Sequence, residues 1–227
     1  MGLGFLAVVL SVAVSFQPLS PLLTTAPVVK PFLRRLRAGK HGAATNALLR
    51  WALTVFLSIL LCAVFVKDRA VSSFPFAQTA ADSAEQMIAG AGAAPAGFVY
   101  ILAGLLTFVG LSAVSLGIGA CLLASVAIGA AAGATITLYA QGNNILLMAL
   151  VALPPWQWAV FAAALLLCVP SAGAGARKLY KMEVGKPDAV LLKQPGLIAG
   201  GLLLFALLCR LALAGPWLSL VRSWTVF

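Results

Sequence analysis

Charge is missing from the middle of this chain: residues 86–176 form a run of 91 positions without one Asp, Glu, Lys, Arg or His. A water-soluble domain needs charged surface residues to stay solvated, so this absence excludes one over that stretch. A bilayer with a hydrocarbon core about 30 Å thick requires roughly 20 apolar residues for each helical crossing. The run is long enough for three or four crossings, and the sequence therefore predicts an integral membrane protein.

Residues that carry catalysis or ion coupling are also scarce. The chain has five acidic residues and one histidine, and no acidic residue falls in a predicted span. A carboxylate relay for protons or sodium therefore has no members. The sequence contains no Ser-His-Asp set, no H-E-x-x-H, no P-loop and no Gly-rich dinucleotide turn. We expect no catalytic residue, no cofactor and no enzymatic activity.

Cysteine is sparse and is not arranged in pairs. Each of the four cysteines lies inside an apolar stretch, without a C-x-x-C motif or a neighbouring histidine: Cys62, Cys121, Cys168 and Cys209. This pattern predicts small packing residues, and neither a metal site nor a disulfide framework.

Apolar residues and positive charge are what the chain has in abundance. Apolar residues make up 63% of it and charged residues only 9%, and the mean hydropathy is +1.08. The net charge is +10, but the basic residues sit in two short runs beside apolar segments. We therefore expect them to face anionic lipid in the cytoplasm, with no nucleic-acid partner.

Glycine, proline and tryptophan divide the apolar sequence into five predicted transmembrane helices. The glycine-containing region 115–119 permits a tight reversal, and the pair Pro154-Pro155 cannot continue a helix. Residues 140–155 contain an apolar piece too short to cross, which predicts a short re-entrant or interfacial element. The predicted spans are 46–66, with its uncharged part beginning at Trp51, then 97–116, 121–139, 156–176 and 196–214.

The basic residues predict the orientation of these spans. Residues 30–50 carry six positive charges and no negative one, which places them in the cytoplasm by the positive-inside rule. Residues 67–96 are neutral in sum and form an extracytoplasmic loop. Three spans then return the chain to the cytoplasm at the basic run that begins with Arg177, and the last span ends outside. We expect a multi-pass membrane protein whose basic runs face the cytoplasm.

The first 29 residues are uncharged and contain several prolines. They lack the positive start of a secretory signal, and they predict a membrane-associated segment. This segment is either an additional span with its N-terminus outside or a helix along the membrane surface. The predicted organisation is an apolar segment 1–29, a basic cytoplasmic segment 30–50 and a membrane domain 51–227.

A few individual residues suggest roles of their own. Gly129 and Gly133 form a G-x-x-x-G face that predicts close helix packing. His41 has no carboxylate near it in sequence and is expected in a solvated loop. Arg210, the charge inside the last span, lies one turn from the outer end and is expected to snorkel to the interface. A candidate interaction cluster on the outer side comprises Gln141, Gly142, Asn143, Asn144, Pro154, Pro155 and Trp156.

The order of these features resembles the stage II sporulation protein M family, SpoIIM, of endospore-forming bacteria. The resemblance covers roughly residues 46–220. It comprises a basic start, one span, an outer loop, the Gly129/Gly133 helix, a turn at Gln141-Gly142, the Leu153-Pro154 motif before the next span, a basic loop, and a last span that ends at Pro216.

The resemblance implies a non-enzymatic scaffold of the engulfment machinery. Such a protein recruits two cell-wall hydrolases, the sporulation proteins D and P, to the septal membrane of the mother cell. Loop 67–96 and the outer cluster would then contact these partners.

The rival hypothesis is a transporter or permease subunit. Its solute path would use Thr135, Thr137, Tyr139, Gln141 and Asn143. A third hypothesis is a structural membrane protein without a fixed partner. The sequence leaves open the oligomeric state and whether any solute is transported.

Overall fold

The computed structural model describes residues 2–80, 82, 98–139, 155–183 and 189–225. Within these ranges the chain forms helices and no β-strand. The helices are α1 (Gly2–Val14), α2 (Ser20–Arg37), α3 (His41–Ser72), α5 (Phe98–Val114), α6 (Ile118–Tyr139), α8 (Pro155–Lys178) and α9 (Ala189–Thr225). The predicted all-α fold class is confirmed.

Four helical segments of the described chain are long and apolar enough to cross a bilayer: His41–Val66, Ile118–Ile136, Trp156–Lys178 and Pro195–Ala212. They correspond to the first, third, fourth and fifth predicted spans. The second predicted span, 97–116, matches α5, a shorter apolar helix of 17 residues. The architecture is that of a polytopic membrane protein.

The tight reversal predicted at residues 115–119 is also present. Helix α5 ends at Val114 and α6 begins at Ile118, with Leu116 at φ 55° and Gly117 at φ 86° between them. Glycine suits Gly117 because it adopts a positive φ without strain, and because a Cβ there would lie 2.6 Å from the Phe32 ring. The turn thus also fixes how closely α2 approaches α6.

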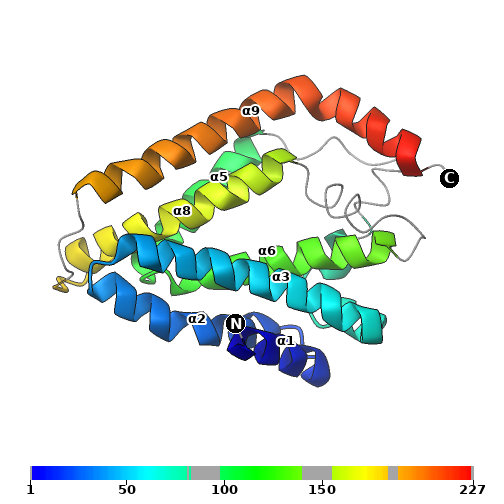
Figure 1. The fold of residues 1–227 in the computed structure, drawn as a ribbon, viewed down its shortest axis with the longest axis horizontal. Coiled ribbons are helices and arrows are strands. Elements are labelled where there is room, and N and C mark those ends of the chain that lie inside the picture. The colour runs from blue at the N-terminus through cyan, green and yellow to red at the C-terminus, as the bar shows by residue number, and fades with distance from the viewer. Residues whose placement is uncertain (1, 81, 83–97, 140–154, 184–188, 226–227) are drawn as a thin grey trace.

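Figure 1 shows the helices arranged in successive layers. Helix α9 lies along α8, α8 packs on α5, and α3 packs on α6. Helices α1 and α2 cover the far side, where both contact α3 and α2 also contacts α6. The core between them includes Phe32 from α2, Leu48, Val55 and Ile59 from α3, and Val169 from α8.

The described residues of both basic runs lie toward one end of the molecule, on the left of Figure 1. His41, at the start of α3, lies against Gly173 near the end of α8, and a Cβ on that glycine would be 3.0 Å from the imidazole Cε1. On the same side, the Tyr180 hydroxyl donates a hydrogen bond to the Val114 carbonyl. This end, here called the basic end, agrees with the predicted return of the chain to the cytoplasm.

The N-terminal helices do not end at the predicted segment boundaries. Helix α2 crosses the boundary at residue 29, and α3 crosses the one at residue 50. Helix α2 contains Pro27 and Pro31 in its interior. It remains helical because neighbouring helices pack on it. Helix α1 runs beside α3, where a Cβ at Gly4 would be 3.3 Å from the Thr54 methyl group. Residues 2–37 therefore form a helical hairpin that packs into the bundle.

The last predicted span, 196–214, agrees with the apolar segment Pro195–Ala212, but the helix that contains it is longer than the span. Helix α9 has 37 residues and continues through Pro216 to Thr225. Proline removes one backbone hydrogen bond and bends a helix without necessarily ending it. Figure 1 accordingly shows α9 changing direction in its C-terminal part.

Candidate functional site

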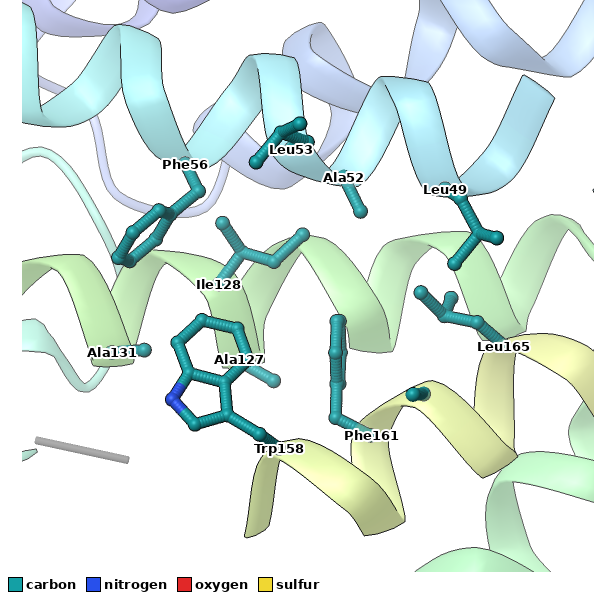
Figure 2. Close-up of a pocket in the computed structure, with 11 residues that line it drawn as sticks. Leu49, Ala52, Leu53, Phe56, Ala127, Ile128, Ala131, Trp158, Phe161 and Leu165 are labelled. Atoms are coloured by element: carbon teal, nitrogen blue, oxygen red, sulfur yellow. The ribbon is translucent and has the colours of Figure 1, made fainter. Parts of the chain in front are cut away.

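An apolar groove between α3, α6 and α8 is the candidate site. Its volume is about 210 Å³. Figure 2 shows its side chains: Trp158 and Phe161 extend from α8, and Phe56 and Leu53 approach from α3. Every lining residue is apolar or aromatic: Leu49, Ala52, Leu53, Phe56, Ala127, Ile128, Ala131, Trp158, Phe161, Ala162 and Leu165.

One aromatic contact joins two walls of this groove. The rings of Phe56 and Trp158 meet edge to face, with centroids 5.7 Å apart and planes at 89°. Edge-to-face pairs are a favoured aromatic geometry, so the contact ties α8 to α3 directly. Behind the rings, small residues of α6, Ala127 and Ala131, form the floor, which leaves the space unfilled.

The groove opens on the outer surface of the bundle. Leu49 and Leu53, on its α3 side, are 37% and 57% exposed. In a bilayer such side chains face lipid or another membrane helix. The described lining of the site therefore suits apolar side chains or acyl chains. In the described part of the chain, no cluster of His, Cys, Asp and Glu side chains could hold a metal ion.

Buried polar groups instead bind the helices to one another. The Thr24 and Ser125 hydroxyls, on α2 and α6, lie 2.5 Å apart. The Trp51 indole Nε1 donates to the Thr24 carbonyl oxygen at 2.8 Å. The Ser112 hydroxyl donates to the Cys168 carbonyl oxygen at 2.7 Å and joins α5 to α8. Thr135, a residue of the hypothetical solute path, is buried and donates to the Ala131 carbonyl oxygen of its own helix.

The glycines of the G-x-x-x-G motif lie at a close contact between α6 and the segment that follows α3. A Cβ at Gly129 would be 2.9 Å from the Phe74 Cβ, and a Cβ at Gly133 would be 2.8 Å from the Ala77 Cα. Only a residue without a side chain fits either place without movement of its neighbour.

Most of the predicted outer cluster lies outside the described residues, namely Gln141, Gly142, Asn143, Asn144 and Pro154. Pro155 is the first residue of α8, a position that tolerates proline because its missing N–H would have no helical partner. Trp156 is 3% exposed and packs against Ala206 and Cys209 of α9. Its ring therefore joins α8 to α9 and does not face the surface.

The structure shows how far two residues singled out in the sequence, His41 and Arg210, are buried. His41 was expected in a solvated loop, and this is wrong: it is 5% exposed and begins α3. Neither ring nitrogen has a hydrogen-bond partner among the described residues, and Gly173 lies directly against the imidazole. Arg210 is partly buried on α9, next to Cys209, and so lies near the level where α8 begins.

Sequence reasoning did not find the groove. Trp158, Phe56 and Phe161 belong to apolar stretches of the sequence in which no residue is distinctive. The groove arises where three helices, distant in sequence, fail to fill the space between them. No protein-family model matches this chain, and no curated protein or solved structure matches it either.

Proposed function

We propose that this chain is a non-enzymatic membrane scaffold that holds peptidoglycan hydrolases at the septal membrane during sporulation. The proposal joins the SpoIIM resemblance to one observation, the open apolar groove between α3, α6 and α8. The partners would be counterparts of the sporulation proteins D and P, or membrane proteins that carry them.

The groove supports docking of a partner's transmembrane helix. Small residues on its floor, Ala127 and Ala131, would let apolar side chains of that helix approach the α6 backbone closely. The aromatic walls, Phe56, Trp158 and Phe161, would supply a large contact area. In lipid such association is driven by packing, because apolar burial alone gives no advantage over lipid tails. A shaped recess therefore favours a particular helix.

The transporter alternative has less support. The buried hydroxyls of Thr24, Ser112 and Ser125 are engaged in hydrogen bonds between helices, so they are not available to line a polar path. The groove itself has no polar lining that would replace a solute's water.

The test is affinity capture of the tagged chain from sporulating cells in mild detergent. Ala127→Phe would fill the groove, and we expect it to reduce the amount of captured hydrolase severalfold while the chain's own abundance is kept. Ala103→Phe is the matched control, because Ala103 is also an exposed alanine but lies on α5 away from the groove. Equal capture by both variants would exclude the groove as the contact.

Deletion of the chain tests the biological role. We expect loss of septal thinning and arrest of engulfment. Normal engulfment together with altered solute accumulation would contradict the scaffold and favour the transporter.

A further inference from the structure

Two adjoining grooves run along α2 and the beginning of α3 at the basic end. The first has a volume of about 550 Å³ and is lined by Lys30, Arg34 and Lys40. The second, about 810 Å³, extends from Arg35 past Arg50 to Thr54. Pro31, Arg35 and Ala43 line both, so the two grooves are continuous.

The lining of these grooves is strongly cationic. Five basic side chains contribute to it: Lys30, Arg34, Arg35, Lys40 and Arg50. Among the described residues no carboxylate lines either groove, and the chain contains no Asp or Glu before Asp68. Cations gathered without a counter-charge repel one another, and an anion bound between them would relieve that repulsion.

A separate apolar crevice lies between α1 and α3, and it has no described lining residue in common with the cationic grooves. Gly2, Leu3 and Gly4 of α1 form one wall of the second groove, opposite Trp51 and Thr54. Further along, α1 and α3 enclose an apolar groove of about 360 Å³ whose lining includes Phe5, Val9, Leu61 and Phe65. Arg50 and Leu61 are separated by about 16 Å of helix, close to the depth of one bilayer leaflet, about 15 Å.

The presence of both a cationic region and an apolar crevice favours a phospholipid over a free phosphate as the ligand. A free phosphate would use the cationic grooves alone and would leave the crevice empty. A phospholipid would place its phosphate among the cations and an acyl chain along α1 and α3. Basic pockets between transmembrane helices on the cytoplasmic side are a known class of anionic-lipid site. Because Arg35 is half-buried and lines both grooves, it is the central contact.

We propose that the grooves between α1, α2 and α3 bind an anionic glycerophospholipid, with the phosphate held by Arg35 and Arg50 and an acyl chain in the crevice lined by Phe5, Val9 and Leu61. A lipid with two phosphates can occupy both grooves and should bind more tightly than one with a single phosphate. This proposal does not depend on the scaffold function.

The experiment measures binding to the purified full chain in neutral detergent. Phosphatidylglycerol, diphosphatidylglycerol or phosphatidylcholine is titrated in mixed micelles, and the bound lipid is counted by native mass spectrometry. We expect saturable binding of the two anionic lipids, strongest for diphosphatidylglycerol, and none for phosphatidylcholine. A parallel titration with inorganic phosphate should not raise the unfolding temperature, whereas phosphatidylglycerol should.

Paired charge substitutions locate the site. The double variant Arg35→Gln/Arg50→Gln should weaken binding roughly thirtyfold, since each cation near an anionic lipid adds about a factor of five. The control Arg177→Gln/Lys178→Gln removes the same charge from the same end of the molecule but from neither groove. It should leave binding unchanged within about twofold. Arg35→Lys/Arg50→Lys keeps the charge and should retain most of the affinity, which separates lost binding from lost folding.

Three results would overturn the proposal. Equal weakening by the two glutamine pairs would mean that charge over the whole basic end, and not the grooves, attracts lipid. Stabilisation by inorganic phosphate as large as that by phosphatidylglycerol would assign the site to a free anion. Equal binding of phosphatidylcholine would remove the role of the cations.

Discussion

The hydroxyl oxygens of Thr24 and Ser125 lie 2.5 Å apart in the buried interior, although 101 positions separate the two residues in sequence. Thr24 also donates to the Ser20 carbonyl oxygen of its own helix at 2.8 Å, which makes Ser125 the donor in the contact between helices. The Thr24 carbonyl oxygen accepts the Trp51 indole N–H. One turn of α2 thus binds both α3 and α6, and α2 is an integral part of the bundle.

Substitution of these two hydroxyls should have unequal effects. Thr24→Val leaves the buried Ser125 hydroxyl without its partner and should lower the free energy of unfolding by about 1–3 kcal/mol. Ser125→Ala should cost less, about 0.5–1.5 kcal/mol, because Thr24 keeps its bond to Ser20. Unfolding by sodium dodecyl sulfate in mixed micelles measures both. Equal costs would contradict this assignment of donor and acceptor.

Because Gly133 is in close contact with Ala77, we expect one methyl group added at Gly133 to lower the stability of the protein. Gly133→Ala should lower the free energy of unfolding by about 1–3 kcal/mol, because the new Cβ would overlap the Ala77 backbone. Gly104→Ala is the matched control, since a Cβ at Gly104 would meet nothing within 4 Å. The double variant Gly133→Ala/Ala77→Gly should recover part of the loss. If Gly104→Ala proves as harmful, general helix effects would explain the result instead.

Because the imidazole of His41 is buried, we expect an apolar residue of similar size at this position to make the protein at least as stable. Neither ring nitrogen has a hydrogen-bond partner in the described part of the chain, and unsatisfied polar groups cost about 1–3 kcal/mol when buried. His41→Leu should therefore raise the unfolding temperature or leave it unchanged. His41→Ala should lower it, because a cavity would open beside Gly173. If leucine were as harmful as alanine, the imidazole would have a polar role that packing does not reveal.

The spans and their reversals could be predicted because few physical factors decide them. A bilayer allows only backbone whose hydrogen bonds are satisfied internally, so uncharged runs of about 20 residues become helices. The turn at Gly117 follows from residues that accept a positive φ. Both constraints are local, and a single sequence displays them.

Helix α2 was not recognised because its charge and its prolines suggest a loop. Yet Val28, Phe32 and Leu36 recur every four residues, and all three are buried. That spacing is the apolar stripe of an amphipathic helix, and it was available in the sequence. Pro27 and Pro31 would disrupt an isolated helix, but neighbouring helices can support a proline-containing helix.

The apolar groove and the burial of His41 could not be predicted in the same way. Phe56, Ala127 and Phe161 come from three helices, and nothing in any one of them specifies how far apart the helices lie. The burial of His41 depends on Gly173, 132 positions later in the chain, which leaves room for the ring. Such features depend on tertiary packing, which periodicity does not encode.

We expect Trp156 to hold α9 against α8. The reactivity of the native cysteines can measure this contact. Cys209 belongs to the same small buried cluster as Trp156, while Cys121 and Cys168 are buried elsewhere and are 2% and 0% exposed. Trp156→Ala should make Cys209 react with a maleimide severalfold faster and leave the other two unchanged. Trp156→Phe should have a much smaller effect, because most of the contact area remains. Equal acceleration at all three thiols would instead indicate general unfolding.

The position of the basic residues makes the orientation in the membrane testable with introduced cysteines. Lys178 and Asp82 are both exposed, the first at the basic end of α8 and the second beyond the opposite end of α3. In intact cells, an impermeant maleimide should label Asp82→Cys and spare Lys178→Cys, and permeabilised cells should show both labelled. The native cysteines are buried and should give little background. The reverse pattern would place the basic end outside, where it could not face cytoplasmic anionic lipid, and would put loop 67–96 on the wrong side to meet cell-wall hydrolases.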